Sequence, residues 1–364
     1  MKSTAPSRAA KAAASGLGIC LVLSLAGCAS DGTTYGTTTG APTTGVYVVQ
    51  NTAASTTVAA SGSILEFSAS ASGAATPVSV IANSNVSSLA LLTIDGSGNL
   101  YTTSTQSTPG QTAATSSVVE YPVGSTNNVQ PIRTLPFNST TQLNALNGLA
   151  ADPMGGIYAP EDSGGVAIFS PTATGSVAPN GYILGDTQTG GGLSTLVATT
   201  AAATDAKGHL YVVNNGTGVA NPIVVFSTTT TGNAAPIRSI GGALTMIAAG
   251  TPQAIATDSA GNLYVANVVA GVSSILVFDP AATGNTAPLR DITGTSTQLG
   301  CVGGIAVDTE SSFVYVVSTP TCGSTANPTV LKFSTVGTGD IAPVSSFTST
   351  AWTNADAKLS VAVY

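Results

Sequence analysis

The feature that most constrains this chain is a strand-rich repeat of about 50 residues that recurs between Gly45 and Tyr364. Its clearest copy runs from Ile255 to Val265 and reads Ile-Ala-Thr-Asp-Ser-Ala-Gly-Asn-Leu-Tyr-Val. Repeats of this kind are typical of propellers, in which each unit buries its faces only against its neighbours. The sequence therefore constrains the shape of the protein more tightly than its chemistry.

Three residue types keep one order through six copies of the repeat. A tyrosine marks the second strand, an aromatic residue ends the third strand, and a proline opens the fourth. Because three interleaved series agree, chance similarity within a Thr-rich chain does not explain the repeat. The markers are Tyr47, Tyr101, Tyr158, Tyr211, Tyr264 and Tyr315, then Phe67, Tyr121, Phe169, Phe226, Phe278 and Phe333, then Pro77, Pro131, Pro179, Pro236, Pro288 and Pro343.

Each copy is expected to form four antiparallel strands, with a run of small residues innermost and an Asp-x-x-Gly turn after it. The aspartate can accept a backbone hydrogen bond at the start of the turn, and the glycine supplies the positive φ that the hairpin needs. These carboxylates are therefore interpreted as structural. In the last copy, one extra residue separates Asp308 from its tyrosine, which predicts a longer turn. The regular turns are Asp95–Gly98, Asp152–Gly155, Asp205–Gly208 and Asp258–Gly261.

The two ends of the repeat region complement each other. The first copy starts at Gly45 with a second strand and has no first strand before it. Residues 359–364 match the first-strand pattern, with Tyr364 in the usual aspartate position. Pairing this last strand into the first copy would close the ring and remove an open sheet edge. The fold class predicted is all-β, a six-bladed propeller over residues 45–364.

The low charge of the chain agrees with blades that are covered on both faces. Only 7% of residues are charged, and strands such as the run from Pro222 to Phe226 are continuously apolar. Disorder is the rival interpretation, but disordered segments lack aromatic residues at a regular period. Without residues 1–27, six basic and sixteen acidic residues remain, a net charge of −10. Nucleic acid and anionic lipid are therefore poor partners.

The first 27 residues have the features of a signal peptide. Three basic residues, Lys2, Arg8 and Lys11, precede an apolar stretch over 16–26 and the sequence Leu-Ala-Gly-Cys, which ends at Cys28. This stretch is too short to span a bilayer core, which needs about 20 residues in a helix. The sequence up to Cys28 resembles the lipobox of bacterial lipoproteins, which implies cleavage before Cys28 and acylation, including palmitate, on it. The alternative is an ordinary signal peptide whose cleavage site contains a cysteine.

The same resemblance implies a place for the protein in the cell. In many Gram-negative lipoproteins an aspartate directly after the lipidated cysteine signals retention at the inner membrane, whereas this chain has Ala29 and Ser30. The expected location is therefore the bacterial envelope, lipid-anchored in the outer membrane. Residues 28–44 are rich in Gly and Thr and are expected to form a flexible tether.

The repeat region contains two cysteines and one histidine, whose side chains are candidates for covalent, metal or acid–base chemistry. Cys301 precedes the first strand of the last copy and Cys322 follows the second, so both are expected at one end of the sheet and can form a disulfide. The alternatives are that the two cysteines bind a metal or stay as free thiols. No further His or Cys lies near either cysteine in the sequence to support these alternatives. His209, the only histidine of the sequence, follows the glycine of a turn and is interpreted as a solvated turn residue.

The Asp-x-x-Gly-Asn-Leu-Tyr-Val units resemble NHL repeats and the propellers of the SMP-30/gluconolactonase group. Some members of these families are binding surfaces, and the lactonases hold a divalent cation at the channel mouth with carboxylate and Asn ligands. Here the mouth is expected at the cysteine end, from loops that join second to third and fourth to first strands. The lactonase pattern is matched incompletely, and the only acidic pair among the candidates makes Glu161, Asp162 and Asn214 the best candidates for a calcium or zinc site. The alternative is that Glu161 and Asp162 are solvated loop charges. The other polar candidates are Asn51, Asn147, Asn215, Gln253 and Asn267.

Two functions follow from these features. The favoured one is a membrane-anchored envelope lipoprotein whose propeller is a non-enzymatic binding scaffold without a cofactor, for a protein, glycan or small-molecule ligand. This function fits the sequence, which contains neither a Gly-x-Ser-x-Gly motif nor a phosphate-binding loop with its lysine. The alternative is a metal-dependent, lactonase-like hydrolase at the channel mouth, in which the cation polarises a carbonyl and activates water.

Overall fold

The computed structural model describes residues 45–52, 61–82, 88–106, 115–162, 164–186, 193–216, 218–248, 250–322, 324, 326–352 and 360–364. The expected signal peptide, Cys28 and the tether lie outside these residues. In the described part of the chain the regular structure is strand, apart from two short 3-10 turns, η1 (Ala243–Thr245) and η2 (Thr295–Thr297). No helix among the described residues is long and apolar enough to cross a membrane.

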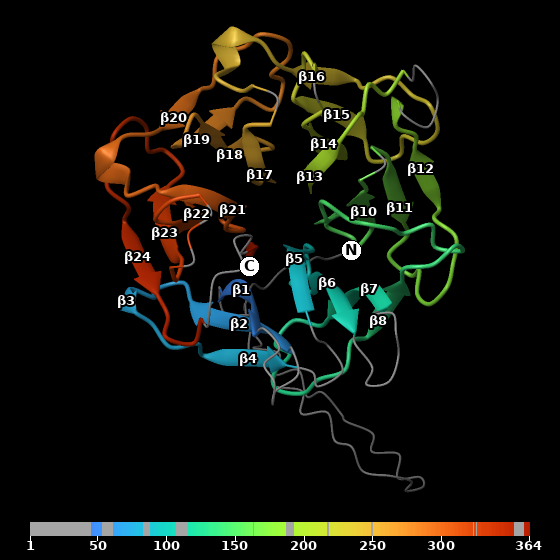
Figure 1. The fold of residues 1–364 in the computed structure, drawn as a ribbon, viewed down its shortest axis with the longest axis horizontal. Helices are drawn as coiled ribbons and strands as arrows, with labels where there is room; N and C mark the ends of the chain where they lie inside the picture. Colours follow the sequence, from blue (N-terminus) through green and yellow to red (C-terminus); the bar gives the residue numbers. More distant parts are fainter. Residues whose placement is uncertain are drawn as a thin grey trace, which may run out of the picture. The chain divides into compact units, whose positions relative to one another are not determined.

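The strands form six sheets arranged around a central axis, which confirms the all-β, six-bladed propeller (Figure 1). In each blade the first strand named here is innermost and neighbours are antiparallel. Blade 1 consists of β25 (Val361–Val363), β1 (Gly45–Thr52), β2 (Ser61–Ser68) and β4 (Ser79–Ala82). Blade 2 consists of β5 (Ser88–Ile94), β6 (Leu100–Gln106), β7 (Thr115–Tyr121) and β8 (Arg133–Pro136). Blade 3 consists of β9 (Ala150–Ala151), β10 (Ile157–Pro160), β11 (Val166–Phe169) and β12 (Gly181–Ile183).

The remaining three blades repeat the same order. Blade 4 consists of β13 (Thr199–Thr204), β14 (His209–Asn214), β15 (Ile223–Ser227) and β16 (Arg238–Ile240). Blade 5 consists of β17 (Pro252–Thr257), β18 (Leu263–Val269), β19 (Val272–Phe278) and β20 (Arg290–Ile292). Blade 6 consists of β21 (Cys301–Val307), β22 (Phe313–Thr319), β23 (Thr329–Ser334) and β24 (Ser345–Thr348), and the short β3 (Gly73–Ala74) of the first repeat adds to its outer edge.

The last strand closes the ring, as the sequence predicted. In β25, Val363 faces Val46 and Val361 faces Val48, antiparallel to β1. The backbone N–H of Tyr364 donates to the carbonyl oxygen of Gly45 at 3.2 Å, so Gly45 lies at the end of the propeller that carries the Asp-x-x-Gly turns. We call this the Asp-turn end. The C-terminal strand therefore lies innermost in blade 1, near the axis of the disc (Figure 1).

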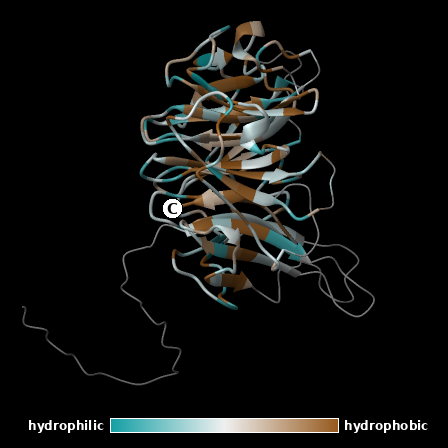
Figure 2. Ribbon diagram, turned by 90° about the vertical axis from the view of Figure 1, so that its left-hand side faces the viewer, coloured by the Kyte–Doolittle hydropathy of each residue, from teal (hydrophilic) through white to brown (hydrophobic). Residues whose placement is uncertain are grey.

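The hydrophobic core lies between neighbouring blades rather than inside one sheet. Six clusters of buried residues each combine side chains from two adjacent blades, and hydrophobic residues follow the strands in the side view (Figure 2). The repeating aromatic residues at the end of the third strand are at most 2% exposed. Their regular spacing in the sequence thus reflects one packing position repeated around the ring.

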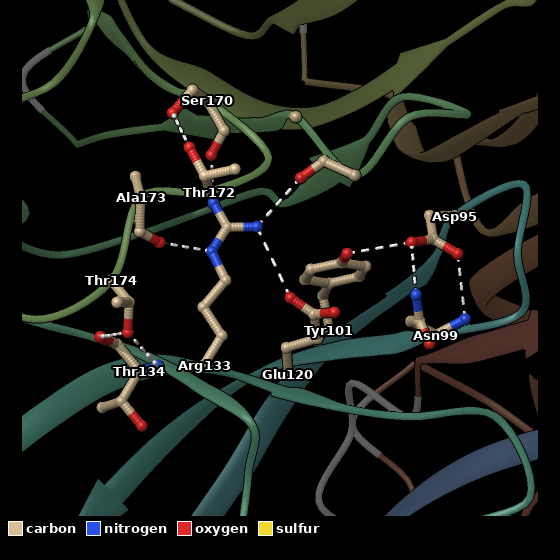
Figure 3. Close-up of polar contacts among 12 residues, drawn as sticks. Asp95, Asn99, Tyr101, Glu120, Arg133, Thr134, Ser170, Thr172, Ala173 and Thr174 are labelled. Atoms are coloured by element: carbon tan, nitrogen blue, oxygen red, sulfur yellow. Dashed lines mark hydrogen bonds and ion pairs between the residues drawn. The ribbon is translucent and has the colours of Figure 1, made fainter.

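Each regular Asp-x-x-Gly turn is held by its own aspartate. The Oδ1 of Asp95 accepts the backbone N–H groups of Ser97 and Asn99 at 2.8 and 2.9 Å, and its Oδ2 accepts the hydroxyl of Tyr101 at 2.9 Å (Figure 3). The carboxylates are therefore structural, as expected from the sequence. Burial, and then the neighbouring aspartate, raises the pKa of three equivalent tyrosines to about 12: Tyr158, Tyr211 and Tyr264.

The turn of blade 6 departs from this arrangement because of its extra residue. The Oδ1 of Asp308 accepts the backbone N–H groups of Ser312 and Phe313 at 2.7 and 3.2 Å, and Ser311 adopts a positive φ of 56°. The hydroxyl of Tyr315 is buried and has no hydrogen-bond partner among the described residues. The longer turn therefore keeps the backbone bonds of the motif and loses the bond between tyrosine and aspartate.

An arginine on the outer strand of blade 2 ties that blade to the next (Figure 3). Arg133 is 6% exposed and donates to the carbonyl oxygens of Gly155 at 2.9 Å, Ser170 at 2.6 Å and Ala173 at 2.5 Å, all in blade 3. Its Nη1 also lies 3.5 Å from the carboxylate of Glu120. The guanidinium is thus satisfied mainly by backbone carbonyls of the neighbouring blade.

A second tie between blades recurs at all six interfaces and was not predicted from the sequence. Four residues before each repeat proline, a residue with positive φ reaches the outer strand of the preceding blade. Five of these residues donate a backbone N–H to that strand at 2.6–2.7 Å, and in the first repeat the contact is the parallel pairing of β3 with β24. The outer edges are therefore covered. The residues are Gly73, Asn127, Gly175, Gly232, Gly284 and Gly339.

Candidate functional site

A cavity of about 420 Å³ opens on the propeller axis at the end opposite the Asp-turn end. Residues from all six blades line it, and Cys301, Cys322 and Ser360 lie in its wall. We call it the mouth cavity. A narrower cavity of about 170 Å³ continues along the axis. Both cavities touch one ring of apolar residues, one from each blade, which forms the floor of the mouth cavity: Leu92, Leu149, Ala202, Ile255, Ile305 and Val361.

The wall of the mouth cavity is built by irregularities in the innermost strands. The pairing register shifts between Thr199 and Ala201 in β13, between residues 252 and 254 in β17, and between residues 302 and 304 in β21. A similar shift occurs in β5. The residues inside three of these shifts, Thr200, Gln253 and Gly303, all line the cavity. Such bulges are frequent beside functional sites because they redirect side chains.

The mouth cavity has two chemically different sides. Blades 3 to 5 contribute amides and a hydroxyl: Asn147, Thr200, Asn215 and Gln253. Blades 6, 1 and 2 contribute glycines, aliphatic side chains and the cysteine pair, with the hydroxyls of Thr319 and Ser360. None of the described residues that line the cavity is Asp, Glu, Lys, Arg or His. The described lining therefore holds no group for acid–base chemistry near neutral pH.

The structure places the predicted mouth residues in two groups. Asn147, Asn215 and Gln253 line the cavity. Asn51 and Asn267 do not line the cavity, because their side-chain amides form hydrogen bonds with backbone groups instead. Asn51 accepts the N–H of Leu89 at 2.6 Å, and Asn267, which is 1% exposed, donates to the carbonyl oxygen of Met246 at 3.1 Å. From sequence alone, an asparagine that ties a loop is indistinguishable from one that faces a cavity.

The three residues predicted to bind a metal are already engaged in the described structure. Glu161 is 3% exposed and accepts the hydroxyl of Tyr182 at 2.5 Å. Asn214 is fully buried and accepts the N–H of Val197 at 2.9 Å while it donates to a loop carbonyl. The carboxylate of Asp162 accepts the amide of Asn147 at 3.2 Å.

Among the described residues, no group of three or more His, Cys, Asp or Glu side chains is placed to hold a metal ion. The donor set of Glu161, Asp162 and Asn214 contains only two carboxylates, and the Asn214 amide is used on both sides by backbone. The calcium or zinc site belongs to the hydrolase alternative, and metal analysis of the purified protein tests it.

The two cysteines are bonded to each other at the rim of the mouth cavity. Cys301 and Cys322 form a disulfide with their Cα atoms 4.9 Å apart, within the range usual for such bonds. The bond ties the start of β21 to the loop after β22. His209 lies at the Asp-turn end, where its Nδ1 is 2.7 Å from the carboxylate of Asp205. The histidine is therefore remote from the mouth and belongs to the turn.

Comparisons with known proteins support the fold. No family model matches the chain, and no curated protein is similar to it in sequence. A crystal structure of a protein of unknown function from Bacteroides caccae superposes with a TM-score of 0.54 and 8% identity, over 88% of this chain and 98% of that one. The resemblance to NHL repeats and the SMP-30/gluconolactonase group stays a prediction.

Two WD40 structures are more distant. The RRP9 repeats give a TM-score of 0.42 at 11% identity, over 69% of this chain and 61% of that one. The Toxoplasma gondii coronin domain gives 0.42 at 10% identity, over 71% and 70%. At 8% identity, the likeness to the Bacteroides caccae structure supports the fold alone.

Proposed function

We propose that this protein is a lipid-anchored lipoprotein of the bacterial outer membrane whose propeller is a non-enzymatic binding scaffold. One observation carries the binding role: a cavity of about 420 Å³ to which all six blades contribute and whose described lining is uncharged. Its volume lies within the range of small-molecule sites, about 300–1,000 Å³. A rigid ring that presents such a cavity at one end is suited to hold a ligand.

The first described residue of the propeller and the mouth cavity lie at opposite ends of blade 1. Gly45 lies at the Asp-turn end, because the N–H of Tyr364 bonds to its carbonyl oxygen. Ser360, directly before β25, lines the mouth cavity.

The disulfide supports a location outside the cytoplasm. Disulfides persist in oxidising compartments and are rare in the cytosol of mesophiles. Cys301 and Cys322 are paired at the rim. An extracytoplasmic location is what export through the expected signal peptide and acylation of Cys28 would produce.

The anchoring half of the proposal is tested by fractionation and mass spectrometry. The wild-type chain, expressed in a Gram-negative host, is expected in the outer-membrane fraction with acylated Cys28 as its first residue. The Cys28→Ser variant is expected to leave that fraction. A wild-type chain that starts elsewhere without a lipid would contradict the anchor.

The binding half is tested by native mass spectrometry of the mature protein after incubation with a small-molecule extract of the envelope. We expect bound mass on the wild type that is lost in Gln253→Trp, which fills the mouth cavity. Met154→Trp is the matched control, since Met154 is 80% exposed in an Asp-x-x-Gly turn at the other end. Retention of the same mass by Gln253→Trp would contradict a site in the mouth cavity.

A further inference from the structure

We infer that the mouth cavity selects a small, uncharged, amphipathic ligand that carries an amide next to an aliphatic group. This inference rests on the proposed binding function and adds the chemical class of the ligand. It follows from three properties of the cavity: its lack of charge, the free hydrogen-bonding capacity of two amides, and its apolar floor.

The first property is that the described lining offers no partner for an ionised ligand. No described residue of the wall carries a charge, and the cysteines are joined in a disulfide. A charged group that leaves water without a partner incurs a large desolvation cost, whereas a neutral polar group needs only hydrogen bonds. The carboxylate of Asp162, which is not part of this lining, is bonded to the amide of Asn147. A ligand without net charge therefore fits this site best.

The second property is the hydrogen-bonding capacity of two amides on the polar side. Asn147 donates one N–H to Asp162 at 3.2 Å, and Gln253 donates one N–H to the carbonyl oxygen of Thr251 at 3.1 Å. A carboxamide has two N–H donors and a carbonyl acceptor. Within the described residues, each side chain thus keeps one donor and its oxygen for a ligand. A donor beside an acceptor is complementary to another amide.

Asn215 has a different task in the same wall. Its Nδ2 donates to the hydroxyl of Thr200 at 2.9 Å and to the carbonyl oxygen of Pro252 at 3.1 Å, and its Oδ1 accepts the N–H of Gly250 at 3.1 Å. These bonds join the bulge of blade 4 to the residue directly before Gln253. Asn215 is therefore a positioning residue that holds the polar side of the cavity in place.

The third property is the apolar floor. Its six residues are aliphatic, come one from each blade and are 4–9% exposed, so they face the axis with little contact to water. Burial of an aliphatic group there would contribute through the hydrophobic effect. The amide side chains of the described lining lie above this floor on blades 3 to 5. A ligand with an amide at the rim and an aliphatic chain toward the axis satisfies both.

The inference is tested with four probes: N-acetyl-leucinamide and three compounds that each differ from it in one group. Each probe is titrated into the mature full-length protein in detergent, and binding is measured by NMR and calorimetry. N-acetyl-leucinamide is neutral and has the aliphatic chain. N-acetyl-leucinate adds a negative charge, leucinamide a positive charge, and N-acetyl-glycinamide removes the chain. We expect the neutral leucine probe to bind about tenfold more tightly than each of the other three, with shifts at Asn147 and Gln253.

Variants connect this preference to the cavity. Gln253→Leu keeps the size of the side chain and removes its amide, so it should weaken the neutral probe about tenfold, while Met154→Leu should leave binding unchanged. Gln253→Glu should instead favour leucinamide. Equal affinity for charged and neutral probes, no binding of N-acetyl-leucinamide at millimolar concentration, or an unaffected Gln253→Leu variant would overturn the inference. If these probes overturn the inference but an envelope molecule still binds the wild type and not Gln253→Trp, the proposed binding function stands without this ligand class.

Discussion

Replacing one tyrosine hydroxyl at a time measures what the bond between tyrosine and aspartate contributes to a blade. Tyr101 and Tyr315 occupy equivalent positions and are each 1% exposed. The hydroxyl of Tyr101 donates to Asp95 at 2.9 Å, whereas that of Tyr315 has no partner among the described residues. Tyr→Phe changes the packed area equally at both positions. The two variants therefore differ mainly in one hydrogen bond to a carboxylate.

The expected effects have opposite directions. A hydrogen bond to a charged group contributes about 1.5–3 kcal/mol, and the amide of Asn99 still donates to Asp95 in the variant, so Tyr101→Phe should cost about 2 kcal/mol of the free energy of unfolding. Tyr315→Phe removes a buried hydroxyl that lacks a partner. It should be neutral or should stabilise by up to about 1 kcal/mol.

The assay is guanidinium chloride unfolding followed by circular dichroism, with both variants and the wild type measured side by side. A double-mutant cycle that adds Asp95→Asn should show coupling for Tyr101 and none for Tyr315. Losses of similar size in the two phenylalanine variants would refute the reasoning, because they would assign the effect to packing and not to the hydrogen bond.

Three further predictions follow from the buried tyrosines, the disulfide and the mouth. Burial raises the pKa of five tyrosines to about 12, above the value of about 10 in the unfolded chain. Their contribution to the free energy of unfolding is therefore fully present below pH 10 and is lost as the pH rises toward 12. The loss is up to about 1.4 kcal/mol for each tyrosine and each pH unit. The part of the absorbance change at 295 nm that corresponds to these five tyrosines should therefore coincide with unfolding seen by circular dichroism, and ionisation of all the tyrosines before unfolding would contradict this. Replacing both Cys301 and Cys322 by serine should lower the free energy of unfolding by roughly 3 kcal/mol on the chain-entropy model, and an unchanged denaturation midpoint would show that the bond is not a structural constraint. Elemental analysis of the purified protein should find no stoichiometric calcium or zinc, whereas a metal lost in Glu161→Ala or Asp162→Ala would favour the hydrolase. The tyrosines with this pKa are Tyr121, Tyr158, Tyr211, Tyr264 and Tyr315.

The architecture could be predicted from the sequence because its determinants are local and repeated. The turn of Asp95 needs only residues within six positions, and the same pattern returns in each blade. Ring closure was visible because residues 359–364 match a strand that the first repeat lacks, although the paired strand covers only Val361–Val363. The lengthened turn at Asp308 was likewise readable as one extra residue, but the resulting loss of a partner for Tyr315 was not.

The candidate site was less predictable because its determinants come from different repeats. Thr200, Gln253 and Gly303 share a bulge position and no chemical feature, so nothing in their identity marks them as wall residues. Asn214 and Asn215 are adjacent, yet the first holds the preceding loop and only the second lines the cavity. The ties between blades, such as that of Gly175 to Thr134, join residues of successive repeats, so the glycine four residues before a repeat proline does not reveal its partner within one copy.

Closure of the ring by β25 is the claim on which the mouth cavity and its ligand depend, and it can be tested directly by oxidative crosslinking. Val48 faces Val361 across the junction of β1 and β25. The Val48→Cys/Val361→Cys variant is expected to form an intramolecular disulfide nearly completely and to gain stability. The offset pair Val48→Cys/Ala362→Cys places its side chains on opposite faces of the sheet and is expected to stay reduced. No crosslink in the facing pair, or equal crosslinking in both pairs, would contradict the closed six-bladed ring.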